Sequence, residues 1–197
     1  DPAAAPSATL TPGGAATSPA TGKRAASSPE ASTLAAETAA LEQVLFKLRR
    51  EHDAAGALAL LDQSAPLFSR STLGLEAKVA RVDALLMLGE RRQALAILDQ
   101  LPLAQVGRGG EMRVLRAELR ATDDCAHALS DFDVLVTQAL SASLAERAMY
   151  GRAACEVQVG DTSHARQDFS QYLKRFPNGR FAAAARRELE RSAGKAP

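Results

Sequence analysis

The sequence predicts an all-α protein built from repeated pairs of helices. From Leu34 onward, apolar residues recur at spacings of three and four, which is the period of an amphipathic helix. The alternation of apolar and polar residues that is typical of half-buried strands is absent. An alanine also recurs at separations of 37, 34 and 37 residues, at Ala57, Ala94, Ala128 and Ala165, which indicates an internal repeat.

Residues 1–33 predict a disordered linker. Five of the nine prolines fall here among Ala, Ser, Thr and Gly, and Leu10 is the only large apolar side chain before Leu34. Such a stretch cannot bury enough apolar surface to offset its conformational entropy. Because the chain begins at Asp1 without Met, we expect a further segment upstream, such as a signal sequence, a membrane anchor or another domain.

The helical repeat domain is expected over 34–192, followed by a flexible tail at 193–197. A polar break at Glu51-His52-Asp53 separates the first two helices, and Gly89-Glu90 and Gly160-Asp161 are expected turns. The predicted helices are 35–50, a segment holding Ala57 to Leu67, 75–88, a segment holding Ala94 to Leu101, 110–121, 125–138, 144–159, 162–175 and a closing helix at 180–192.

The repeat follows the pattern G-[DE]-x3-A-x3-[LF]-x2-[LY] most closely in the second and fourth units. A small alanine lets the second helix of a pair approach the first, and the residue four positions later fills the layer between neighbouring pairs. The residues expected to pack the repeats are Ala57, Ala94, Ala128, Ala165, Leu61, Leu98, Phe132 and Phe169.

At these residues the chain resembles the tetratricopeptide repeat (TPR) family, whose unit is 34 residues long. The fourth unit, which continues to Tyr172, Phe176 and Pro177, is similar to repeats of bacterial cell-envelope TPR proteins. Arg116 departs from the pattern, because a small residue is usual at that position. The resemblance implies a right-handed α-solenoid of about four helix pairs plus a C-terminal capping helix.

In TPR proteins the first helix of each pair lines a concave groove that binds peptides. By this resemblance, the side chains expected to face the groove are Arg49, Asp83, Arg113, Arg120, Arg147 and Tyr150. Arginine forks can clamp a carboxylate or an acidic peptide. The alternative is that the arginines form solvated faces with glutamate partners, as in the segment 186–190.

Two cysteines, Cys125 and Cys155, lie at the start of one predicted helix and late in the next. Antiparallel packing of these helices brings the two thiols together, and a disulfide there would contribute about 3–4 kcal/mol. It would also indicate an oxidising compartment such as the periplasm. The alternatives are two buried free thiols or a zinc site completed by His127 and His164, against which the lack of a Cys-x2-Cys spacing argues.

The composition excludes several function classes. Because 24 basic residues balance 23 acidic ones, the chain is not expected to coat nucleic acid or an anionic membrane. No apolar run is long enough to span a bilayer. The three histidines form no triad pattern, and Gly107-Arg108-Gly109-Gly110 follows no strand, so that we interpret it as a flexible connector. We therefore expect no catalytic residues, no cofactor and no metal.

Two functions remain. The first is a non-catalytic scaffold or adaptor that binds a peptide or protein in a bacterial envelope complex, tethered through the region before Asp1. The second is the extracytoplasmic sensory or regulatory domain of a membrane-anchored regulator. Both predict a periplasmic or other extracytoplasmic location, and free cysteines would instead favour a cytoplasmic adaptor.

Overall fold

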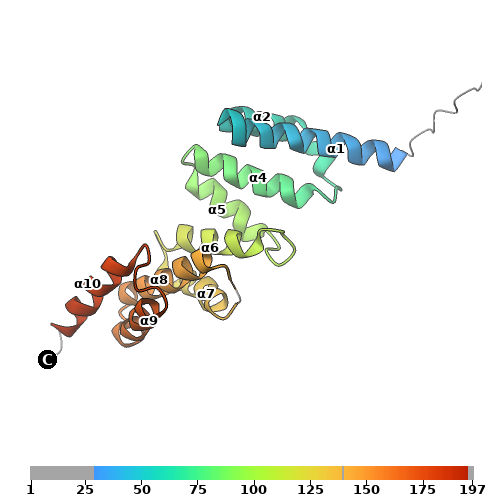
Figure 1. The fold of residues 1–197 in the computed structure, drawn as a ribbon. Coiled ribbons are helices and arrows are strands. Elements are labelled where there is room, and N and C mark those ends of the chain that lie inside the picture. The colour runs from blue at the N-terminus through green and yellow to red at the C-terminus, as the bar shows by residue number, and fades with distance from the viewer. Residues whose placement is uncertain (1–28, 139, 195–197) are drawn as a thin grey trace, which may run out of the picture.

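A computed structural model describes residues 29–138 and 140–194 of the chain. Over these ranges every regular element is helical, which confirms the all-α prediction (Figure 1). The elements are α1 (Pro29–Phe46), the π-helical turn η1 (Lys47–Glu51), α2 (Ala54–Gln63), α3 (Ala65–Phe68), α4 (Gly74–Met87), α5 (Arg91–Gln100), α6 (Gly109–Arg120), α7 (Cys125–Val136), α8 (Ala142–Gln158), α9 (Thr162–Arg175) and α10 (Ala182–Ala193).

The helices pack mainly on their neighbours in chain order. Helix α1 contacts α2, α2 contacts α4, and the series continues through α5, α6, α7, α8 and α9 to α10. Helices α1 and α10 therefore lie at opposite ends of an elongated molecule (Figure 1). Buried apolar side chains form separate clusters along its length instead of one centre.

The recurring alanines lie in α2, α5, α7 and α9, and each is buried. The residue four positions later is buried as well, so all eight side chains expected to pack the repeats lie in the core. The approach is close at Phe132, whose Cζ atom would lie 2.4 Å from a Cβ atom added to Gly151 of α8. A chain with no Trp and few aromatic residues fills its core by bringing helices this close.

An acidic residue stands four positions before each recurring alanine, at the N-cap of the helix. The side chains of Asp53, Asp124 and Asp161 each accept a hydrogen bond from a backbone N–H of the first helical turn. Gly89 and Gly160 precede two of the caps with φ of 79° and 86°, a backbone conformation that glycine adopts without strain. The G-[DE] pattern thus ends one helix and begins the next.

Three of the differences from the predicted boundaries have a local cause. Helix α1 begins at Pro29, inside the predicted linker, because proline is well suited to the first turn of a helix; the rest of that linker lies outside the described residues. The predicted helix through Leu67 is interrupted at Ser64, because Pro66 has no N–H to donate within a continuous helix and instead lies in the first turn of a new helix, α3. Gly109 and Gly110 form the first turn of α6, where a Cβ atom on Gly109 would lie 1.9 Å from the carbonyl oxygen of Leu103.

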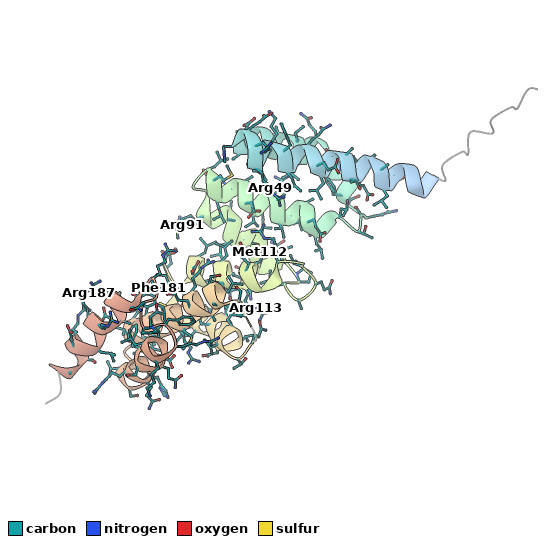
Figure 2. All side chains as sticks on the ribbon, viewed as in Figure 1. Arg49, Arg91, Met112, Arg113, Phe181 and Arg187 are labelled. Atoms are coloured by element: carbon teal, nitrogen blue, oxygen red, sulfur yellow. A yellow bond between two sulfur atoms is a disulfide. The ribbon has the colours of Figure 1, made fainter. Side chains whose placement is uncertain are left out.

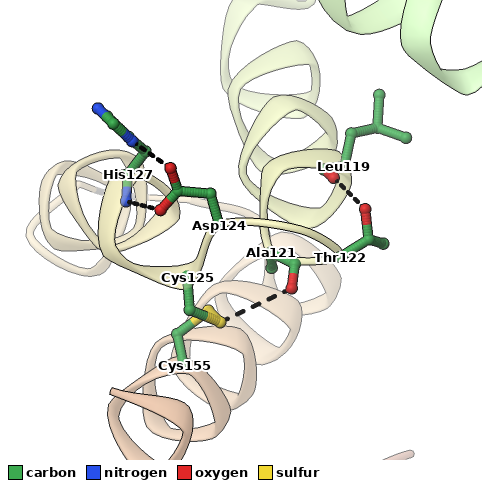
Figure 3. The surroundings of a disulfide bond; sticks show 7 residues. All are labelled: Leu119, Ala121, Thr122, Asp124, Cys125, His127 and Cys155. Atoms are coloured by element: carbon green, nitrogen blue, oxygen red, sulfur yellow. Dashed lines mark hydrogen bonds and ion pairs between the residues drawn. A yellow bond between two sulfur atoms is a disulfide. The ribbon is translucent and has the colours of Figure 1, made fainter.

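The two cysteines form a disulfide between the start of α7 and the end of α8 (Figure 3). Their Cα atoms are 5.0 Å apart, as the antiparallel packing of these helices predicts. The two histidines of the zinc alternative each contact the N-cap aspartate of their own helix. Nδ1 of His127 contacts Asp124 of α7, and Nδ1 of His164 contacts Asp161 of α9. The disulfide joins the third repeat unit to the fourth.

Replacing both cysteines, as Cys125→Ala with Cys155→Ala, should lower the free energy of unfolding by about 3–4 kcal/mol, because the bond closes a loop of 30 residues in the unfolded chain. Urea unfolding with and without reductant measures this change. Reductant should destabilise the natural chain and leave the double variant unchanged. If both thiols of the denatured, unreduced protein react with an alkylating agent, no disulfide is present.

Candidate functional site

A row of ion pairs crosses the first helices of three repeat units. We call Asp83, Arg108, Glu111, Glu118 and Arg147 the charged strip. The Arg108 guanidinium joins α4 to α6, donating to Asp83 at 2.8 Å and to Glu111 at 2.9 and 2.8 Å. Its hydrogen bonds are the main reason that the pKa of Glu111 is lowered. Arg147 of α8 then donates to Glu118 of α6 at 2.8 and 2.5 Å.

At the N-terminal end of the charged strip lies an apolar hollow of about 150 Å³, which we call the N-terminal hollow. It lies between α1, α4 and the loop before α6. Two residues predicted for the groove, Arg49 and Asp83, stand at its rim. Arg49 is exposed and has no ion-pair partner within the described ranges (Figure 2). The floor of the hollow consists of Leu41, Leu45, Val79, Ala80 and Val106.

Tyr150 occupies the C-terminal end of the same series of first helices. Its ring stacks on Phe181, with centroids 4.4 Å apart, and meets Phe169 and Tyr172 at 5.9 and 6.0 Å. Burial raises the pKa of its phenol group. Tyr150 therefore packs α8 against α9 and the start of α10, and only part of its ring is open to a ligand.

Arg113 and Arg120 lie on a different side of α6. Arg120 donates to Asp99 of α5 at 2.6 Å and to Asp131 of α7 at 3.1 Å, so it faces the second helices. Arg113 lies seven residues, or about two helical turns, before Arg120 and therefore shares its side of α6, away from Glu111 and Glu118. The structure thus divides the predicted set, placing Arg49, Asp83, Arg147 and Tyr150 apart from these two arginines.

Two buried Arg–Asp pairs connect the first and second helices of the third and fourth units. Arg116 donates through both Nε and Nη2 to Asp131, whose side chain is 5% exposed, and this bonding raises the pKa of Arg116. Arg152 makes the same two-fold contact with Asp168. Each aspartate lies three residues after the recurring alanine, and Arg116 departs from the small-residue pattern because it has this partner.

These two pairs were not predicted from the sequence. The sequence carries one signal for them, because Ala-x2-Asp-Phe occurs at both 128–132 and 165–169. In the first two units the corresponding residues are Leu60 and Ile97, which are apolar. An aspartate at a buried position of a helix predicts a cationic partner, although it does not say which of the 19 arginines is that partner.

No family model matches the chain, and no match was found among the curated proteins or the solved structures. The resemblance to TPR proteins accordingly stays a prediction. In the part of the chain that the structure describes, no helix has the length and apolar character needed to cross a bilayer.

Substituting Asp131→Ala should lower the free energy of unfolding by about 2–4 kcal/mol, because it leaves Arg116 buried without its counter-charge. Asp133→Ala is the matched control, since that side chain is 64% exposed and should contribute less than about 0.5 kcal/mol. Urea unfolding of both variants measures the difference. Equal losses in the two variants would show that the buried pair has no special weight.

Proposed function

We propose that the chain is a non-catalytic protein–protein interaction module, a TPR-like right-handed α-solenoid that binds a peptide or protein along its first helices. The observation that carries this proposal is the position of the N-terminal hollow beside the charged strip, on helices α1, α4, α6 and α8. The serial packing of helix pairs and the buried alanines support the solenoid.

The chemistry of this surface favours one kind of ligand. A hollow of about 150 Å³ admits a group about the size of a benzene ring, so it suits one large apolar side chain. Arg49 at the rim has an unpaired guanidinium, which prefers a carboxylate. The charged strip holds three carboxylates and two guanidinium groups that pair with one another, and the acidic Glu76 also lines the hollow, so Arg49 is the one lining cation outside an ion pair. The preferred ligand is therefore an extended segment in which an apolar residue lies next to an acidic residue.

The proposed setting is a complex on the extracytoplasmic side of a bacterial envelope. The disulfide between Cys125 and Cys155 supports this setting, because disulfides persist in oxidising compartments and are rare in the cytosol. Scaffold and adaptor roles require only a binding surface held on a rigid frame, and the helix pairs supply that frame.

Selection of a displayed random-peptide library on the whole chain tests the proposal. The selected peptides should carry an apolar residue beside an acidic one, and Arg49→Glu should weaken their binding about ten-fold or more, because a charge-assisted hydrogen bond is replaced by repulsion. Binding is measured by fluorescence anisotropy of a labelled peptide.

Arg50→Glu is the matched control, because Arg50 is the next residue, is exposed and does not line the hollow. It should change the dissociation constant by less than about two-fold. Peptides that bind both variants equally well would show that the interface lies elsewhere on the protein.

A further inference from the structure

A second hollow, of about 470 Å³, lies between α7, α8 and α9 and shares no residue with the charged strip or the N-terminal hollow. We call it the acidic hollow. Its charged lining comes from all three helices and their caps. It consists of Asp133 of α7, Arg152 and Glu156 of α8, and Asp161, His164 and Asp168 at the cap and along α9.

Three of the four carboxylates in the acidic hollow have partners. Asp168 accepts both hydrogen bonds of the Arg152 fork, and Asp133 lies 3.6 Å from the same guanidinium. Asp161 caps α9 and accepts from His164 through the backbone N–H at 3.2 Å, with Nδ1 at 2.6 Å. These contacts use the two cationic groups that line the hollow.

Glu156 is the exception. Its side chain lines the acidic hollow, the residue is only 9% exposed, and its Oε2 atom has no hydrogen-bond partner among the described residues. Burial, and next the charge of Asp168, raise the pKa of Glu156 to about 7. A buried carboxylate oxygen without a partner is costly, because it has lost its hydration and gained no donor.

We propose that the acidic hollow is a binding site for an organic cation, whose ammonium or guanidinium group donates to the carboxylate of Glu156. The four carboxylates outnumber the single arginine and histidine, so the hollow is negative whether or not His164 is protonated. An N–H donor fits better than a metal ion, because no three His, Cys, Asp or Glu side chains within the described ranges are grouped as metal ligands.

This site is independent of the proposed groove, since it uses other residues and lies where α8 meets the second helices α7 and α9. The same chemistry is offered by two sources, a Lys or Arg side chain of a bound protein and a free polyamine. Their shared feature is a cationic nitrogen on a flexible apolar stem. In the hollow, Leu129 and Val159 provide apolar contact for such a stem.

The test titrates the whole ¹⁵N-labelled chain by NMR at low salt and pH 8 with three capped tripeptides, Gly-Lys-Gly, Gly-Arg-Gly and Gly-Gln-Gly, and with spermidine. At least one cationic probe should shift amide signals around Glu156, and the Gln peptide should not. Tighter binding of spermidine assigns the site to free polyamines, whereas tighter binding of a peptide assigns it to a protein side chain.

Glu156→Gln should weaken binding of the cationic probe about ten-fold, because it removes the charge and keeps the shape. Glu42→Gln on α1 is the matched control, since Glu42 is exposed and outside the acidic hollow, and it should bind as the natural chain does. Asp133→Asn provides a second variant at an exposed carboxylate of the hollow, with an expected loss of about two-fold. Equal binding by all these variants, or binding of the Gln peptide, would overturn the proposal.

Binding should also weaken about ten-fold from pH 8 to pH 6, since a carboxyl of pKa about 7 is mostly ionised at the higher pH and mostly neutral at the lower one. His164, whose pKa is raised by Asp161, gains a positive charge over the same interval and acts in the same direction. In His164→Gln the pH dependence that remains belongs to Glu156. If that variant binds the cation equally at both pH values, Glu156 is not the acceptor.

Discussion

Close approach of paired helices at a recurring small residue is the constraint on which the rest of this structure depends. The chain has little aromatic bulk, so its helices can exclude water only when their backbones come near each other. Alanine at the contact permits this, and a larger side chain four positions later fills the adjoining space, as Phe132 does against Gly151. Each helix pair buries its apolar face against the next pair, so the side chains on the outer faces are not needed for the core.

The two halves of the molecule meet this constraint with different chemistry. In the first two units the position three residues after the alanine is apolar, whereas in the last two it is an aspartate held by an arginine of the preceding helix. A buried ion pair contributes little net stability, but each member depends strongly on the other. The disulfide joins the same two units. The C-terminal half is therefore held by specific polar and covalent contacts in addition to its apolar core.

The two hollows of the protein also differ in the charges that line them. On the first helices the charged strip pairs internally beside an apolar hollow, and Arg49 is the lining cation of that hollow outside an ion pair. Between α7, α8 and α9 the carboxylates exceed their partners, so that a buried oxygen of Glu156 remains without a donor. The two surfaces favour ligand groups of opposite charge, a carboxylate at Arg49 and a cationic nitrogen at Glu156.

The sequence by itself determined the helices, the turns at Gly89 and Gly160 and the recurring alanines, because periodicity, capping and glycine conformation act over a few residues. It left the disulfide between Cys125 and Cys155 as one of three alternatives, and the packing of α7 against α8 brings the two residues together. The start of α1 and the break at Pro66 were also local features, which the sequence contained and we misjudged. Only the tertiary structure decided which side of α6 carries Arg113 and Arg120, which aspartate pairs with Arg116, and that Glu156 is buried without a partner. These outcomes depend on the rotation of each helix against the next, because a long arginine side chain can reach a partner on either neighbouring helix, as Arg120 does on α5 and α7.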